Sequence, residues 1–312
     1  MDKIKIITPG GYTTIQDKGR FGFQHMGIPV SGVLDDFAFT MANLLVGNHG
    51  NAAVMELTVM GPSIEIREKM DIALTGAKMR MVVNDNLQEQ WCSIRVKPGD
   101  IVNISQVQAG CRAYLSFSGG ISLPEVMGSF STYAGAKIGG FKGRPLQKGD
   151  TLATFDAPLL KRERVLLKKF IPDYPTHVCL RAILGPQDHY FGQSLKTLFS
   201  EEYMVTAKAD RMGYRLQGKP LPIKHNMPKS IISEPSMPGS IQVPPSEQPI
   251  ILLVEQTVGG YAKIATIISS DIAAVAQVTP GDTIRFEKID INNAIVIAIE
   301  REKIINTIKE TL

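Results

Sequence analysis

Apolar residues recur at every second position in several short runs of the chain. Alternation of this kind is typical of strands that bury one face. The runs occupy residues 79–83, 94–96, 113–117 and 151–155. Pro98-Gly99-Asp100 and Pro280-Gly281-Asp282 each place proline and then glycine in the order that a type II turn requires, just before another strand-like run. We interpret both turns as hairpin corners, and the pattern predicts a mainly β protein.

Three segments have helical rather than alternating periodicity. Asp35 and Asp36 can cap a helix over residues 35–46. Its apolar face is expected to comprise Phe37, Met41, Leu44 and Leu45. A second helix is predicted over residues 292–312, where apolar residues near a helical period are Ile295, Ile299, Ile305, Ile308 and Leu312. A third, shorter helix is predicted over residues 271–277.

Three sequence features recur in the same order in the two halves of the chain. Arg20-Phe21-Gly22-Phe23 is echoed by Arg211-Met212-Gly213-Tyr214, Glu56 by Glu234, and the first proline-glycine-aspartate turn by the second. Ordered recurrence of this kind indicates a diverged internal duplication. Prolines and basic residues between positions 156 and 175 mark the junction. We therefore predict two similar β domains, residues 1–160 with an inserted helix and residues 161–312 with a C-terminal helix.

The composition is that of an ordinary folded protein. The 312 residues, 44% of them hydrophobic and 21% charged, suffice for two domains with cores of their own. A net charge of +4 is too small to indicate nucleic-acid binding, and no run of 18 apolar residues predicts a membrane span. Cys92, Cys111 and Cys179 form no paired motif, which favours a reducing cytoplasm.

Several common catalytic motifs are absent from the sequence. It contains no P-loop, no dinucleotide-binding glycine fingerprint, no HExxH and no GxSxG. The five histidines are scattered, so we expect no metal site. Candidate chemistry therefore has to come from polar residues beside glycines, where a ligand can approach the backbone closely.

The densest polar cluster lies among the glycines of residues 13–32. Substrate or ATP binding is predicted there for Gln16, Asp17, Arg20 and Ser31, and a catalytic role for His25. The alternative interpretation is a turn whose aspartate and arginine satisfy nearby backbone groups.

Two further clusters lie in the second half of the chain. Asp210 and Arg211 are adjacent, and an arginine fork can hold a carboxylate or a phosphate, although the pair can equally bond the neighbouring strand. Tyr261 and Lys263 follow Gly259-Gly260 after a buried strand. There the lysine can neutralise an oxyanion, the tyrosine can donate a hydrogen bond and the glycine amides can form an anion nest. A plain hairpin bend is the alternative.

Two other features have both a functional and a structural interpretation. Residues 118–145 are rich in glycine and hydroxyl groups, which is typical of a functional loop or a partner-contact surface, or of a mobile segment. Glu56 and Glu234 can act as paired carboxylates only if the two halves face one another. Otherwise each closes hydrogen bonds within its own domain.

A series of longer blocks resembles a known family. The first is PGGYTTIQDKGRFGFQHMGIPVSGVLDDFAFTMANLLVGN, and the later ones are YLSFSGGI, GSFST, GGFKGRPL, ADRMGYRL, GSIQVPP and GGYAKIATIIS. In this order, and over essentially the whole chain, they resemble the 5-oxoprolinase C subunit family. This family is also called KipI antagonist (KipA) or allophanate hydrolase subunit 2, and it is related to a carboxyltransferase portion of urea carboxylase. Gln242, within GSIQVPP, joins the candidate substrate- or ATP-binding residues, as do Gly259 and Gly260.

The resemblance implies a fold, partners and a reaction. The fold is two cyclophilin-like β-barrel domains, and the partners are a KipI-like B subunit, together with a third, lactam-utilisation subunit. All three are expected to open 5-oxoproline to glutamate with ATP and Mg²⁺, bound by this chain or by its partner. Two alternatives stay open. One is a regulator that relieves the inhibition of a histidine kinase by KipI, and the other is a carboxyltransferase for a urea-like amide, which needs a biotin carrier outside this chain.

For lactam opening, cations and N–H donors have to hold the charge that develops when ATP phosphorylates the lactam oxygen. The expected anion-handling groups are Arg20, His25, Arg211, Tyr261 and Lys263, and the groups expected to orient them or to manage protons are Asp17, Asp210 and Glu234. Arg20, Arg211 and Lys263 are predicted to surround a single cleft.

Overall fold

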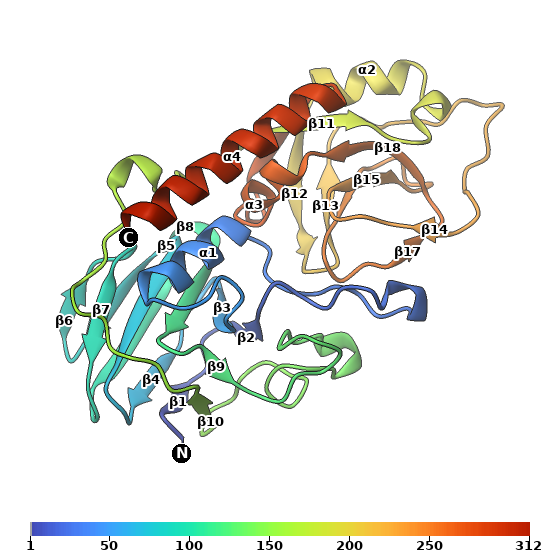
Figure 1. Ribbon diagram of the computed structural model, residues 1–312. Coiled ribbons are helices and arrows are strands. Elements are labelled where there is room, and N and C mark those ends of the chain that lie inside the picture. Colours follow the sequence, from blue (N-terminus) through green and yellow to red (C-terminus); the bar gives the residue numbers. More distant parts are fainter. Residues whose placement is uncertain (1) are drawn as a thin grey trace. The chain divides into compact units, whose positions relative to one another are not determined.

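The computed structural model describes residues 2–312, which divide into two compact units (Figure 1). Unit 1 comprises the segment that ends at Phe21 together with Ser31–Tyr174 and Asn306–Leu312, and unit 2 comprises Gly22–Val30 and Pro175–Ile305. The sequence pattern places a domain boundary after residue 160, whereas the compact units divide after Tyr174. Both units are built mainly from strands, as predicted.

Unit 1 is formed around a ten-stranded antiparallel sheet. Seven strands follow the order β2-β3-β8-β4-β1-β10-β9, and β5 pairs with β6, β7 and β8. The two longest strands, β5 (Met70–Val83) and β8 (Ile101–Phe117), run side by side (Figure 1). The other strands are β1 (Ile4–Thr8), β2 (Tyr12–Gln16), β3 (Val54–Thr58), β4 (Ser63–Ile66), β6 (Asn86–Gln88), β7 (Ser93–Val96), β9 (Ile121–Ser122) and β10 (Thr151–Thr154).

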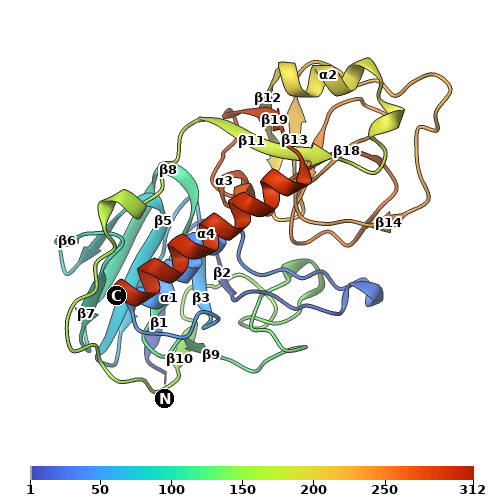
Figure 2. The ribbon, with the colours of Figure 1, turned by 45° about the horizontal axis from the view of Figure 1, so that its top comes forward.

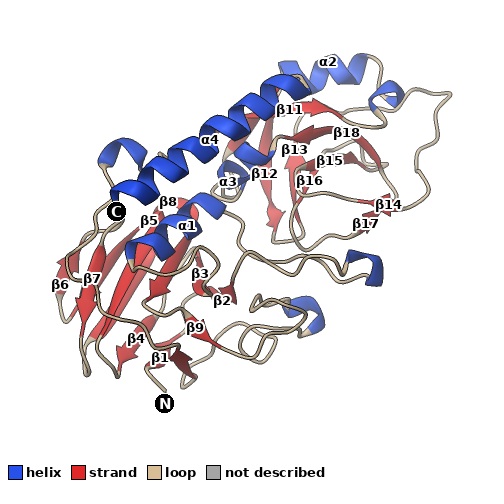
Figure 3. Ribbon diagram, viewed as in Figure 1, coloured by secondary structure: helices blue, strands red, loops and turns tan. Residues whose placement is uncertain are grey.

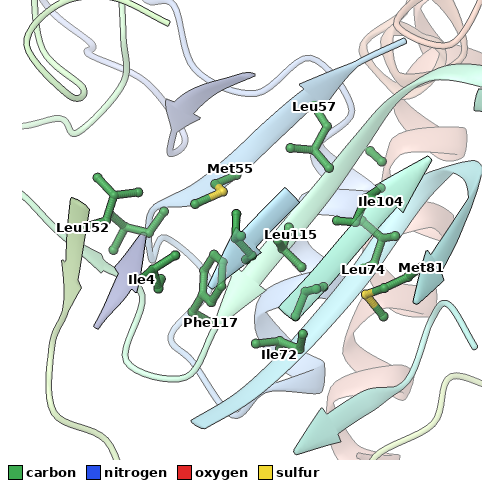
Figure 4. Packing of buried hydrophobic residues seen from close by; sticks show 14 of the residues in the cluster. Ile4, Met55, Leu57, Ile72, Leu74, Met81, Ile104, Leu115, Phe117 and Leu152 are labelled. Carbon is green, nitrogen blue, oxygen red and sulfur yellow. The ribbon is translucent and has the colours of Figure 1, made fainter. Parts of the chain in front are cut away.

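The core of unit 1 follows from the register of its longest strands. Ile72 pairs with Phe117 and Leu74 with Leu115 across β5 and β8, so these side chains lie on one face. All four are fully buried in one apolar cluster (Figure 4). Burying each such side chain stabilises the fold by about 1.5–3 kcal/mol.

Helix α1 (Asp36–Leu45) confirms the first predicted helix. Asp35 is its N-cap, and the Asp35 carboxylate accepts a hydrogen bond from the Ala38 amide at 2.9 Å. The helix packs on β5 and β8 (Figure 2). Its buried residues include Ala38, Phe39, Met41, Ala42 and Leu45. Phe37 and Leu44 are only half-buried, because the face that meets the sheet is rotated from the one expected.

Unit 2 is a closed barrel of seven strands in the order β11-β18-β15-β16-β13-β12-β19. Every neighbouring pair is antiparallel except β19 with β11, which is parallel and closes the barrel. The barrel strands are β11 (His177–Leu184), β12 (Glu202–Ala209), β13 (Gly213–Gln217), β15 (Ser240–Val243), β16 (Ile250–Leu252), β18 (Ala262–Ile267) and β19 (Thr283–Lys288). Two short strands, β14 (Glu234–Pro235) and β17 (Val258–Gly259), pair separately.

The remaining helices lie in the second half of the chain (Figure 3). They are α2 (Gln193–Ser200), α3 (Ile272–Val275) and α4 (Ile291–Thr311). Short 3-10 helices occur in both halves, and they are η1 (Gln24–Met26), η2 (Ala134–Ala136), η3 (Lys168–Phe170), η4 (Asp188–Tyr190) and η5 (Ser269–Asp271). Helix α4 confirms the helix predicted over residues 292–312, and the η5–α3 segment confirms the shorter helix predicted over residues 271–277. Within residues 2–312, no helix combines the length and the apolar character that crossing a membrane requires.

The expected apolar face of α4 is only partly correct. Ile305 and Ile308 are buried, whereas Ile295 and Ile299 are each 51% exposed. At 3.6 residues per turn the two pairs lie on different faces of one helix, so no single neighbour can bury both.

The two proline-glycine-aspartate turns form, but they are not hairpin corners. Gly99 and Gly281 have φ angles of +90° and +99°, as the third position of a type II turn requires. However, the first turn joins β7 to β8, and these two strands do not pair with each other, because β7 pairs with β5. The second turn joins α3 to β19, so it connects a helix to a strand. Type II turns splay the flanking chains, whereas tight hairpins need the mirror-image turns.

A core substitution tests the packing of unit 1. We expect Leu115→Ala to lower the free energy of unfolding by about 2–5 kcal/mol, because Leu115 is fully buried and leaves a cavity. The control is Leu87→Ala at a side chain that is 61% exposed, which we expect to change stability by less than about 0.5 kcal/mol. Urea denaturation measures both, and equal effects would contradict the assignment of this core.

Candidate functional site

The best-connected polar cluster of unit 2 surrounds Lys263 in β18. The Lys263 side chain is only 4% exposed, and its Nζ donates to Glu234 Oε1 at 2.7 Å. Gln187 Nε2 donates to the same oxygen at 3.1 Å, and Gln187 Oε1 accepts from the Lys263 backbone amide at 3.0 Å. Gln187 therefore ties the main chain of the lysine to the carboxylate that its ammonium group binds.

Strand pairing brings these residues together from distant parts of the chain. Gln242 in β15 lies opposite Lys263 in β18, beside a shift in the β15–β18 register. Such irregularities re-aim a side chain in an otherwise regular sheet. Glu234 in β14 pairs with Gly259 in β17. The barrel and the separate β14–β17 pair thus bring an ammonium, a carboxylate and an amide side chain close together.

The Lys263–Glu234 pair is an ion pair at neutral pH. The hydrogen bond from Lys263 lowers the pKa of Glu234, and this outweighs the opposing effect of partial burial. A buried ammonium group is expensive unless a carboxylate compensates it. Glu234, whose side chain is 38% exposed, connects the buried lysine to solvent.

Two polar groups beside this pair have no hydrogen-bond partner within residues 2–312. They are Gln242 Nε2 and Ser236 Oγ, and both atoms are buried. Gly259 leaves room for them, because a Cβ at this position would lie 2.1 Å from Gln242 Nε2 and 3.2 Å from Ser236 Oγ. Neither Gly259 nor Gly260 has the positive φ that an anion nest of backbone amides requires, so the expected nest is wrong. The absence of a side chain at Gly259 instead allows the Gln242 and Ser236 side chains to pack against it.

The other candidates of unit 2 lie outside this cluster. Arg211 is buried and its Nε donates to Glu255 Oε1 at 2.6 Å. The Asp210 carboxylate accepts from the amides of Met212 and Gly213 at 2.7 and 3.2 Å, so it stabilises the turn between β12 and β13. Tyr261 is 40% exposed.

In unit 1, Asp17 organises the glycine-rich segment. Asp17 Oδ1 accepts from Ser129 Oγ at 2.6 Å, from Ser131 Oγ at 2.5 Å and from the Gly19 amide at 2.9 Å, and Oδ2 accepts from the Phe130 amide at 2.8 Å. These four donors compensate the burial of the carboxylate. The segment between β9 and β10, which is mostly loop (Figure 3), is therefore fixed to β2 at residues 129–131.

Arg20 lies in the same network and is fully buried. Its Nη2 donates to the Ser131 carbonyl at 2.7 Å and its Nε to the Val126 carbonyl at 3.3 Å. Burial lowers the pKa of Arg20, and the charge of Asp17 partly offsets this. Gln16 Nε2 donates to the Thr132 carbonyl at 3.2 Å, and Ser31 is buried with a φ of +54°. Arg20 and Gln16 thus bond the loop backbone, while Arg20 Nη1, Gln16 Oε1 and Ser31 Oγ are buried without a hydrogen-bond partner within residues 2–312. Ligand binding by these residues stays a prediction.

The remaining predictions divide between the units. Tyr114 Oη and the Leu34 amide donate to Glu56 Oε2 at 2.9 and 3.3 Å, so Glu56 and Glu234 each form hydrogen bonds within their own unit. His25 is exposed in η1, on the segment that belongs to unit 2. Of the three residues predicted to surround a single cleft, Arg20 belongs to unit 1, whereas Arg211 and Lys263 belong to unit 2. The single cleft stays a prediction.

Sequence reasoning missed Gln187 and Ser236. Gln187 lies 76 residues from Lys263 and carries no local motif, although its position just after β11 is typical of ligand-contacting residues. Across residues 2–312, no three His, Cys, Asp or Glu side chains are grouped so that they could hold a metal ion.

Residues 26–288 match the family model of the carboxyltransferase domain, subdomain A and B. The chain belongs to this family. The similar proteins include the C subunit of 5-oxoprolinase from Haemophilus influenzae, which is 35% identical over 98% of this chain and 97% of its own length. The C subunit of the Escherichia coli 5-oxoprolinase is 37% identical over 94% of this chain and 93% of its own.

Other members of the carboxyltransferase family are much larger. Urea amidolyase of Lachancea kluyveri is 32% identical over 98% of this chain, which spans 18% of that protein. The crystal structure of K. lactis urea amidolyase matches 99% of this chain with a TM-score of 0.93 and 28% identity, and the chain spans 20% of it. These similarities confirm the resemblance and the predicted fold class, two cyclophilin-like β-barrel domains.

The Asp17 network can be tested through the loop that it holds. We expect Asp17→Asn to lower the free energy of unfolding by about 1–3 kcal/mol, because the new amide cannot accept from all four donors. Trypsin should then cut faster after the exposed Lys137 and Lys142. The exposed Asp173→Asn serves as control. An unchanged cleavage rate in the Asp17 variant would exclude a role for this carboxylate in holding the loop.

The Lys263–Glu234 pair predicts a pH dependence of stability. We expect Glu234→Gln to lower the free energy of unfolding by about 1–2 kcal/mol at pH 7, less than for a fully buried pair because Glu234 is partly exposed. The pKa of Glu234 is lower in the folded state than in the unfolded state, where it is about 4.3. The ion pair therefore stabilises the fold fully when the pH is above the unfolded-state pKa, and this stabilisation is lost as the pH falls through the folded-state pKa. The difference between the two proteins in urea denaturation should therefore shrink below about pH 4. A difference that grows on acidification would contradict this ion pair.

Proposed function

We propose that this chain is the C subunit of an ATP-dependent 5-oxoprolinase, which opens 5-oxoproline to glutamate together with a KipI-like B subunit, assisted by a third, lactam-utilisation subunit. The observation that carries this proposal is the end-to-end match with the 5-oxoprolinase subunits, 97% and 93% of whose lengths are covered. The urea amidolyases, in contrast, contain this region as less than a fifth of a longer chain.

The Lys263 cluster supports this chemistry. A lactam amide is stable, and ring opening becomes easier once a phosphoryl group from ATP makes the lactam oxygen part of a leaving group. Negative charge then develops on groups that fixed N–H donors and a cation can stabilise. Lys263 and Gln242 are such groups in unit 2. Since the sequence contains no P-loop, we propose that Mg²⁺ and ATP bind with the help of the KipI-like partner.

Reconstitution tests the proposal directly. We expect the purified chain, combined with the KipI-like and lactam-utilisation partners, to release phosphate from ATP only when 5-oxoproline is present, with one glutamate formed for each phosphate. Omitting any one of the three proteins is the control. If 5-oxoproline does not stimulate phosphate release in the complete mixture, the proposal is wrong.

Lys263→Ala separates an enzyme from a regulator. We expect it to lower kcat by about 10²- to 10³-fold, as the loss of one charge-stabilising group does, while co-purification with the KipI-like partner is retained. The matched control is Lys219→Ala, an exposed lysine of the same unit that pairs with Glu201 at 2.9 Å. Loss of binding with unchanged turnover would instead favour the regulatory KipI antagonist.

A second candidate function is carboxyl transfer to a urea-like amide. It is favoured by the carboxyltransferase family model and by the TM-score of 0.93 with urea amidolyase. This reaction consumes carboxybiotin on a separate carrier, whereas lactam opening does not. Inhibition of turnover by avidin would favour this candidate over the 5-oxoprolinase.

A further inference from the structure

We infer that Gln242 Nε2 and Ser236 Oγ form a binding site for the carbonyl oxygen of a small, uncharged amide or lactam group, with Gly259 as its floor. This inference names the substrate group of the site around Lys263 and rests on the proposed function. It adds a residue, Ser236, that neither the sequence motifs nor the similar proteins indicate.

The two donors are buried and have no hydrogen-bond partner within residues 2–312. Gln242 is only 3% exposed, and Ser236 is half-buried with its hydroxyl oxygen inaccessible. Buried polar groups of folded proteins are nearly always hydrogen-bonded to protein or to a bound molecule. Two unsatisfied groups that lie side by side therefore point to a shared acceptor.

Gly259 shows that the two groups face the same point. The position of a Cβ on Gly259 is 2.1 Å from Gln242 Nε2 and 3.2 Å from Ser236 Oγ, so both groups pack against the side of Gly259 that carries no side chain, and the Gln242 amide takes the room that a Cβ would need. The Ser236 amide donates to the Thr257 carbonyl at 2.9 Å, which fixes this serine beside β17. The donors are thus held by strand pairing rather than by a flexible loop alone.

Exposed side chains lie next to the site along the chain. Val258 and Tyr261, on either side of the glycines, are 51% and 40% exposed. Glu234 pairs with Gly259 in the β14–β17 sheet and is itself partly exposed. The site is therefore a buried pair of donors beside an accessible edge of unit 2.

Charge balance decides between an uncharged carbonyl and a carboxylate as the ligand group. The cation next to Gln242 is Lys263, and Glu234 already compensates it at 2.7 Å. A carboxylate placed here would add a second negative charge beside Glu234, and like charges at close range disfavour one another. A neutral carbonyl oxygen instead accepts from two neutral donors and gains further from them as negative charge develops on it.

The first experiment detects binding at Gln242 itself. The chain is labelled with ¹⁵N-glutamine, and the Gln242 side-chain amide signal is assigned by its loss in Gln242→Met. We expect this signal to shift on titration with 2-pyrrolidinone or urea, which are uncharged, and with 5-oxoproline. Acetate, a carboxylate without an amide, should not shift it. If none of the three amides shifts the signal, or if acetate shifts it as strongly, the inference is wrong.

Matched variants test the other two residues. Ser236→Ala should weaken the binding of 2-pyrrolidinone by about fivefold to tenfold, which is the effect of losing one hydrogen bond. Gly259→Ala should abolish it, since the new methyl group would collide with the Gln242 amide and displace this donor. Gly260→Ala is the control, because its Cβ would have no neighbour closer than 3.4 Å. Equal binding by the Gly259 and Gly260 variants would overturn the geometry.

Turnover distinguishes this inference from the proposed function. In the reconstituted enzyme, Ser236→Ala should lower kcat at least tenfold with a smaller change in KM, as expected for a donor that acts mainly on developing charge. Gln248→Met is the control, because both amide atoms of Gln248 bond the backbone of Gly218. If the amide shifts are seen but the wild-type complex shows no 5-oxoproline-dependent phosphate release, this site stands and the 5-oxoprolinase proposal fails.

Discussion

The burial of charge inside two β structures is the constraint on which the candidate site depends. An ionised group out of water is stable only if fixed partners replace its hydration. Lys263 meets this condition through Glu234, which Gln187 in turn holds in place. The ammonium group is therefore held in one geometry without being sealed from solvent, because its partner is partly exposed.

The same constraint has a different solution in unit 1. Asp17 is satisfied by hydroxyl and amide donors, and Arg20 Nε and Nη2 donate to backbone carbonyls, while Arg20 Nη1 has no hydrogen-bond partner within residues 2–312. These bonds connect β2 to the glycine-rich loop more than 100 residues away. The segment that carries so many glycines is consequently an ordered loop, and its polar residues are used largely for holding it.

The arginines of the predicted sequence repeat have different partners in the two units. Arg20 and Arg211 occupy corresponding positions in the sequence echo, and both are buried. Arg20 bonds main-chain oxygens, whereas Arg211 pairs with Glu255. The two arginines are thus both buried, with different partners in the two units. The buried Lys263 cluster belongs to unit 2, and this difference between the halves is consistent with a site built from one barrel.

Local patterns were sufficient for many elements of this protein. Alternating residues predicted β5, β7, β8 and β10, and Asp35 predicted the start of α1, because strand and helix periods are properties of neighbouring residues. The family and most candidate residues followed from the motifs. Which candidates meet was decided only by the tertiary structure. Glu234 and Gln187 reach Lys263 across 29 and 76 residues, and Ser236 faces Gln242 across Gly259. The faces of α1 and α4 and the course of both type II turns also depended on distant neighbours. Strand register and barrel closure set these contacts, and neither is encoded in any single segment of the chain.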